Sequence, residues 1–137
     1  MTATTERRLL QAAVAVAALV PLTAGTLGMI EGPAMLRDLV GAAPVDLDSH
    51  FRYLSGLLAG IGVGFVSCIP AIERRGSRFR LLGAIVVFGG LSRLGSLAGA
   101  GTPGPGHLFG LGMELAIVPM LMIWQARFAR RDEMRPT

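Results

Sequence analysis

Two ionisable residues, Arg93 and Glu114, stand inside stretches of chain that otherwise consist of apolar and small residues. A charged side chain in lipid hydrocarbon costs a few kcal/mol even by insertion scales, so such a residue is expected to face a partner or a water-filled cavity. Arginine suits planar acceptors such as a carboxylate, and the pKa of a glutamate responds to burial and to a nearby cation. Ion pairing, anion binding and proton transfer are therefore the chemistry open to these residues.

Arg93 and Glu114 lie in the third and fourth of four apolar stretches, each of which is long enough to cross a bilayer as a helix, which takes about 20 residues. They cover residues 9–29, 53–72, 81–99 and 108–126. The chain is 52% hydrophobic with a mean hydropathy of +0.58, and it lacks the alternating pattern of a membrane barrel. We therefore expect an all-α, integral membrane four-helix bundle, a single four-span domain over residues 1–137 with an outer link at residues 31–49.

The basic residues indicate the topology. All 13 of them are arginines, and most lie before the first apolar stretch, between the second and third, and after the fourth. By the positive-inside rule, this pattern indicates a multi-pass protein of the inner (plasma) membrane whose two termini both lie in the cytoplasm. The first stretch is longer than a usual signal-peptide core, so we expect it to be retained. The same distribution makes the lipid bilayer, and not nucleic acid, the expected partner despite a sequence pI of about 11.

Arg93 and Glu114 are expected to lie at the same depth. Pro103 marks the tip of the third link, with Arg93 ten residues before it and Glu114 eleven residues after it. At a rise of 1.5 Å per residue, each lies about 10 Å inside its helix, and antiparallel helices bring them level. We predict a direct Arg93–Glu114 ion pair. The residues expected to join it around an outward-facing polar cavity are His50, Arg52, Tyr53, His107 and Glu31.

Three roles remain open for this group of residues. The pair can fix helix register as a buried ion pair, Arg93 or Arg52 can bind an anionic headgroup or carboxylate, or Glu114 can serve a proton-linked function. No catalytic motif is present, so no catalytic residue is assigned. His50 and His107 with Glu31 or Glu114 are compatible with a metal site, but their spacing does not demand one. We therefore expect neither a metal nor a cofactor.

Small residues recur at helical spacing in all four stretches. Gly25, Gly28 and Gly32 follow one face of the first, and Ser55 and Ala59 follow one face of the second. Such faces let membrane helices approach closely, because lipid supplies no hydrophobic drive for association. Close helix packing is the direct expectation, and a homo-oligomer or a complex with another membrane protein is a further one.

Two sequence motifs are similar to those of a bacterial membrane-protein family known only as a domain of unknown function. The first is residues 50–56, His-Phe-Arg-Tyr-Leu-Ser-Gly, with Gly60 and Gly62 after it. The second is residues 89–96, Gly-Gly-Leu-Ser-Arg-Leu-Gly-Ser, and Glu114 with Pro119 resembles the family's fourth span. The resemblance implies a four-span bundle and marks Arg52, Arg93 and Glu114 as motif positions. It implies no activity.

The sequence favours a binding or accessory membrane protein whose outward-facing polar cavity holds a small amphipathic or anionic ligand. One alternative is a small proton-coupled transporter that acts as an oligomer. A second alternative is a membrane-embedded enzyme with His50 or Glu114 as general acid or base. A third is a structural subunit of a larger membrane complex.

Overall fold

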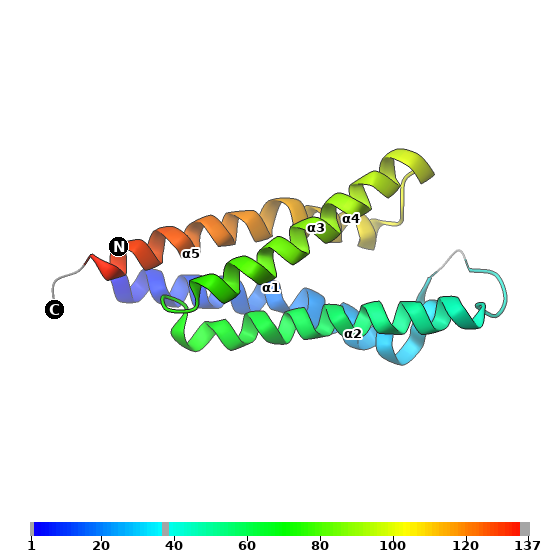
Figure 1. Ribbon diagram of the computed structural model, residues 1–137, viewed down its shortest axis with the longest axis horizontal. Helices are drawn as coiled ribbons and strands as arrows, with labels where there is room; N and C mark the ends of the chain where they lie inside the picture. The colour runs from blue at the N-terminus through cyan, green and yellow to red at the C-terminus, as the bar shows by residue number, and fades with distance from the viewer. Residues whose placement is uncertain (1, 37–38, 135–137) are drawn as a thin grey trace.

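A computed structural model describes residues 2–36 and 39–134, which form an all-α bundle of four long helical rods (Figure 1). The first three rods are α1 (Ala3–Glu31), α2 (Val45–Cys68) and α3 (Gly76–Ala100). The fourth joins α4 (Pro105–Gly112), a π-helical turn (Met113–Ile117) and α5 (Val118–Glu133). All four rods are long and apolar enough to cross a membrane. The predicted all-α architecture is confirmed, and the chain is a multi-pass membrane protein.

The helices extend beyond the apolar stretches that revealed them. Helix α1 continues through Glu31 and α2 begins at Val45, so both helices reach into the outer link predicted at residues 31–49. Residues 37–38 of that link lie outside the described residues. Hydropathy marks the part of a helix that suits hydrocarbon, whereas charged turns can continue the same helix into the headgroup layer. At its other end α2 stops at Cys68, before Pro70, which has no N–H to continue the helix.

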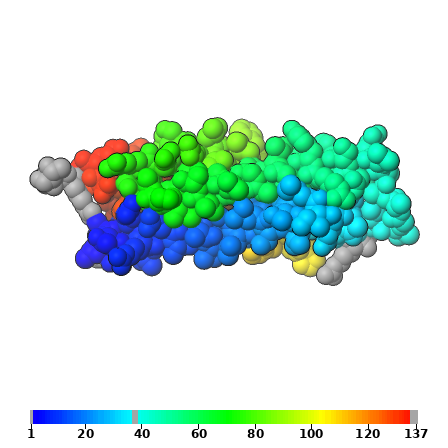
Figure 2. Space-filling model, turned by 90° about the horizontal axis from the view of Figure 1, so that it is seen from below, coloured from blue at the N-terminus to red at the C-terminus, as the bar shows by residue number. Residues whose placement is uncertain are grey.

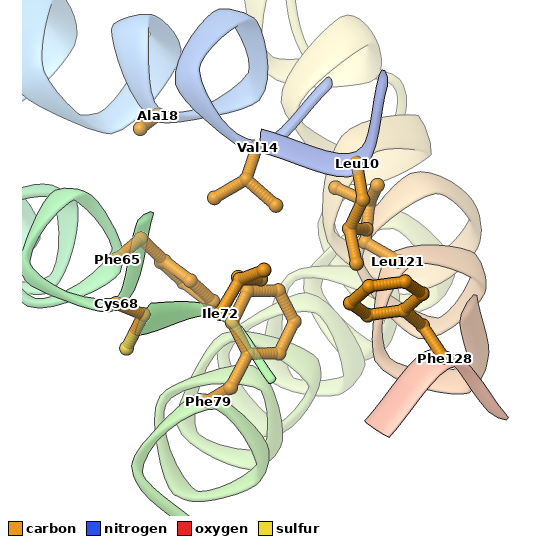
Figure 3. Close-up of a cluster of buried hydrophobic side chains, with 9 residues drawn as sticks. All are labelled: Leu10, Val14, Ala18, Phe65, Cys68, Ile72, Phe79, Leu121 and Phe128. Carbon is orange, nitrogen blue, oxygen red and sulfur yellow. The ribbon is translucent and has the colours of Figure 1, made fainter. Parts of the chain in front are cut away.

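The buried core lies toward the end of the bundle that carries both termini, which we call the terminal end (Figure 1). All four rods contribute apolar side chains that point toward one another there (Figure 3). The ring centroids of Phe65 and Phe79 are 5.0 Å apart in an edge-to-face arrangement, which aromatic pairs prefer. The core consists of Leu10, Val14, Ala18, Phe65, Cys68, Ile72, Phe79, Leu121 and Phe128.

Helix α1 packs against α2 along small residues. A Cβ atom added to Gly25 would lie 2.5 Å from the backbone nitrogen of Ala59, and one added to Gly28 would overlap the side chain of Ser55. The two backbones are therefore nearly in contact, as the sequence predicts from its small-residue faces. This hairpin extends past the tip of the α3–α4 hairpin at the end opposite the termini (Figure 1, Figure 2).

The α3 and α4–α5 rods are more open than the α1–α2 pair. Buried residues make up 22% of the apolar window in each of the first two rods, but 11% in the third and 6% in the fourth. Away from the terminal end, α3 diverges from α2 (Figure 1). Most of the surface of α3 and of the fourth rod therefore faces the surroundings of this chain.

Candidate functional site

Arg93 and Glu114 form a two-bonded ion pair between α3 and the π-helical turn. Arg93 Nε donates to Glu114 Oε2 at 3.1 Å, and Nη2 donates to Oε1 at 3.2 Å. Arg93 lies seven residues before the end of α3, and Glu114 lies nine residues after the start of α4. Both are therefore about 10–13 Å from the helix ends. The parallel two-bond geometry fixes the orientation of both side chains as well as their separation.

The π-helical turn places Glu114 at this position. The N–H of Val118 donates to the carbonyl of Met113, five residues earlier. Pro119 has no N–H, and its ring crowds the carbonyl of the residue four positions before it, Leu115. A locally widened helix accommodates that crowding, and π-helical turns recur at functional sites. The turn was not predicted from the sequence, although Pro119 was a signal for an irregular helix.

Gly90 allows the turn to approach α3. It is buried, and a Cβ atom placed on it would lie 2.9 Å from Glu114 Cβ and 2.7 Å from Leu115 Cδ2. Both distances are shorter than van der Waals contact, so the pair exists at this separation because position 90 has no side chain. Gly90 and Arg93 are one helical turn apart and thus share a face of α3.

Arg93 keeps unused hydrogen-bonding capacity. A guanidinium carries five N–H donors, and Glu114 takes one on Nε and one on Nη2. Among the residues that the structure describes, Arg93 has no second acceptor. Its side chain is 33% exposed, whereas that of Glu114 is 16% exposed. The free donors of Arg93 are thus the accessible polar part of the pair.

Arg52 lies away from the Arg93–Glu114 pair and bonds the end of α1. Its Nη1 donates to the carbonyls of Met29 and Ile30 at 2.6 and 3.0 Å, and its Nε donates to Asp48 at 2.9 Å. The last carbonyls of a helix lack intrahelical donors and attract cations. Arg52 therefore caps the end of α1 from α2, next to Gly32, whose φ of +63° favours glycine.

The remaining predicted residues do not gather around the pair. His50, Tyr53, His107 and Glu31 are exposed, and within residues 2–36 and 39–134 no hydrogen bond joins any of them to Arg93 or Glu114. The structure therefore brings together only Arg93 and Glu114 of the predicted group. Likewise, no three His, Cys, Asp or Glu side chains in the described ranges are grouped so as to hold a metal ion.

Polar contacts at the terminal end were not anticipated from the sequence. Arg7 Nε donates to Glu73 Oε2 at 3.0 Å and Arg7 Nη2 donates to the Pro70 carbonyl at 2.8 Å. Burial alone would raise the pKa of Glu73, but hydrogen bonds from Arg7 and its own backbone and the charges of Arg7 and Arg74 hold that pKa below its ordinary value. Arg7 precedes the first apolar stretch and Glu73 follows the second, so both lie at the terminal end. This common position was the sequence signal from which their contact could have been predicted.

Gln125 is a second unanticipated polar contact. Its side chain is fully buried, and Nε2 donates to the Ile72 carbonyl at 2.8 Å. This bond joins α5 to the segment between α2 and α3. Gln125 is an amide residue within an apolar stretch, and a buried amide needs a hydrogen-bond partner. This was the sequence signal for a polar contact at position 125.

Comparison with known proteins identifies the family. Residues 9–125, most of the chain, match the model of a family described as a domain of unknown function, DUF4345. No curated protein and no solved structure matches the chain. The matched region contains α3 and the π-helical turn with Arg93 and Glu114, on which the candidate site is built. The chain belongs to the DUF4345 family.

Proposed function

We propose that this protein is a binding or accessory protein of the membrane that holds a small anionic or amphipathic molecule at Arg93. The observation that carries the proposal is the set of guanidinium N–H groups left free by Glu114. Donors at hydrocarbon depth require a polar acceptor. A carboxylate or phosphate group satisfies them, because its oxygen spacing matches the fork of a guanidinium.

The openness of the surrounding helices supports an amphipathic ligand. Exposed apolar residues flank Arg93 on α3, including Leu91, which is 50% exposed, and Leu94, which is 43% exposed. An acyl or other apolar chain can lie against these residues while its charged group meets Arg93. The ligand would then reach the site from the lipid phase and from the end opposite the termini.

The distribution of arginines along the chain supports a membrane topology for this site. In our proposal the chain forms a single domain in a bacterial inner membrane, with both termini in the cytoplasm and Arg93 nearer the outer surface. The open α3 and α4–α5 surfaces are compatible with lipid, a second copy or another membrane protein. We assign no cofactor, metal or nucleic acid to the protein.

Native mass spectrometry of mildly extracted protein tests the proposal, because it reports bound small molecules and subunit number together. We expect a bound mass in the wild-type protein that is lost in Arg93→Gln. Decanoate serves as a defined anionic probe and 1-decanol as its uncharged counterpart. Binding of decanoate but not decanol, lost in Arg93→Gln, supports the proposal.

Arg80→Gln is the matched control, since Arg80 is an exposed arginine of the same helix whose guanidinium bonds only Ser77 among the described side chains. It should leave decanoate binding unchanged. Equal binding of decanoate to the wild-type protein and to folded Arg93→Gln would refute an anion site at Arg93.

Proton-coupled transport is the second candidate, and the isolation of Glu114 favours it. Arg93 is the only side-chain partner of the Glu114 carboxylate among the described residues. If an anion draws Arg93 away, the Glu114 carboxylate loses its counter-charge inside a membrane-spanning helix, where an isolated charge is costly, so anion binding and the charge at Glu114 are coupled. Proteoliposomes carrying the wild-type protein should then show pH-dependent anion uptake that Glu114→Gln abolishes. Uptake independent of pH, or unchanged in Glu114→Gln, excludes this candidate.

A further inference from the structure

A shallow groove of about 740 Å³ runs along one face of α5 at the terminal end. Its residues recur at intervals of three and four, which places them on one side of a helix. Met120 and Ile123 are 65% and 53% exposed, so the wall nearer the middle of the rod is apolar and open. The part nearer the C-terminus carries three arginines and ends at Met134, which is 73% exposed. The lining of the groove includes Met120, Ile123, Trp124, Arg127, Arg130 and Arg131.

Glu6 of α1 holds two of these side chains in place. Trp124 Nε1 donates to Glu6 Oε1 at 3.2 Å, and Arg131 Nη2 is bonded to the same oxygen. The Glu6 side chain is only 12% exposed, whereas that of Arg131 is 54% exposed, so the shared acceptor is shielded while the arginine reaches the surface. The Trp124 ring and the Arg131 stem are thus ordered before any ligand arrives, which lowers the entropic cost of binding.

Two arginines of the groove remain uncompensated. Arg127 and Arg130 are exposed, and neither has an acidic partner among residues 2–36 and 39–134. Glu133 lies three residues after Arg130, on the neighbouring part of the same side of α5, but no ion pair joins these two side chains in the part of the chain that the structure describes. The groove therefore combines an apolar wall, an indole and an excess of positive charge.

We propose that this groove binds an anionic phospholipid, with its phosphate at Arg127 and Arg130 and an acyl chain along Met120 and Ile123. The order of the residues along α5 matches the order of groups in a lipid: apolar wall first, tryptophan at the level where indoles sit in a bilayer, then basic residues at the headgroup. Basic pockets at the end of membrane helices recognise anionic headgroups in this way. The site is separate from Arg93 and does not depend on the function proposed there.

The single tryptophan of the chain makes the groove directly observable, because all indole emission comes from Trp124. The wild-type protein is placed in phosphatidylcholine nanodiscs that contain a small, equal fraction of dibrominated phosphatidylglycerol or dibrominated phosphatidylcholine. Bromine quenches only on close approach. We expect the anionic lipid to quench Trp124 at a lower fraction than the zwitterionic lipid. Equal quenching by the two lipids overturns the proposal without the need for any variant.

Substitutions test whether the preference for anionic lipid depends on the arginines of the groove. Arg127→Gln/Arg130→Gln should weaken the apparent affinity for phosphatidylglycerol by about fivefold for each arginine removed. Arg127→Lys/Arg130→Lys should retain the preference, because it retains the charge. Arg8→Gln/Arg74→Gln is the matched control, since both are exposed arginines of the terminal end outside the groove.

Two further results would contradict a lipid site. An equal loss in the Arg8→Gln/Arg74→Gln control means that diffuse charge, and not the groove, attracts the lipid. Reversal of the anionic-lipid quenching by millimolar inorganic phosphate means that the site serves free phosphate. Circular dichroism of each variant checks that the helices persist, and the single variant Arg127→Gln replaces the double variant if the latter does not fold.

Discussion

Gly90 and Glu114 face each other so closely that one methyl group on Gly90 would lie 2.9 Å from the Cβ of Glu114. The contact joins α3 to the π-helical turn one helical turn from Arg93. An ion pair between two membrane-spanning helices therefore depends on a position that carries no charge. The glycine sets the separation of the helices, and this separation sets whether the guanidinium can bond both carboxylate oxygens.

Gly90→Ala should destabilise the protein by about 1–2 kcal/mol, because the added methyl group overpacks the contact with Glu114 and Leu115. Gly89→Ala is the matched control, since a Cβ atom at position 89 meets nothing within 4 Å. That variant should be neutral or slightly stabilising through helix propensity. Titration of each protein with sodium dodecyl sulfate in mixed micelles gives the free energy of unfolding. Equal effects of the two substitutions would show that Gly90 does not set the helix separation.

Gly25→Ala should weaken the α1–α2 hairpin by about 2 kcal/mol, because the new Cβ atom would meet the backbone of Ser55 and Ala59 and the helices would have to separate. A backbone atom cannot move aside as the end of a flexible side chain can. Gly60→Ala, on the facing helix but in open space, is the comparison. The same detergent titration measures both. A stability loss in Gly60→Ala as large as that in Gly25→Ala would contradict the close backbone contact at Gly25.

Arg52→Gln should destabilise the end of α1, because it removes a cation from that end and leaves the Met29 and Ile30 carbonyls without their donor. Arg52→Lys should recover part of this loss, since it keeps the charge but not the forked geometry. Hydrogen exchange of the last turn of α1, followed by mass spectrometry, locates the effect. Exchange that stays as slow in Arg52→Gln as in the wild-type protein would count against the cap.

Arg93→Met and Glu114→Met should each destabilise the protein by about 1–3 kcal/mol, because each leaves a partly buried charge without its partner. The double substitution should lose less than the sum of the two single losses, since it leaves no stranded charge. Unfolding free energies of the four proteins measure the coupling. Strictly additive losses would mean that the observed pair contributes no interaction energy.

Acidification should remove the contribution of Glu73 to stability. The pKa of Glu73 is lower in the folded protein than its ordinary value of 4.5, so its stabilisation is complete above pH 4.5 and fades as the pH falls through the lowered pKa. Glu73→Gln should therefore lower the thermal midpoint in detergent at about pH 7 and have no effect well below pH 4.5. Glu133→Gln, at an exposed carboxylate, controls for general charge effects. A destabilisation by Glu73→Gln that grows on acidification would contradict a lowered pKa of Glu73.

Helix geometry explains which features of the Arg93–Glu114 site could be predicted from the sequence and which could not. The depth of Arg93 and Glu114 follows from counting residues to the helix ends, because the rise per residue is constant. Their direct contact also needs the right rotation of each helix about its axis, which Gly90 and the π-helical turn supply. Arg52, which directly precedes the apolar stretch at residues 53–72, bonds instead to the end of α1.

The sequence by itself determined four membrane-spanning helices, their order and the shared level of Arg93 and Glu114, because these depend on local hydropathy and on distance along the chain. Only the tertiary structure decided which polar groups meet. The terminal-end contacts of Arg7 and Glu6, the capping role of Arg52 and the open α3 surface depend on the tilt and rotation of whole helices. Tilt and rotation are set by packing between residues far apart in the chain, which no local pattern records.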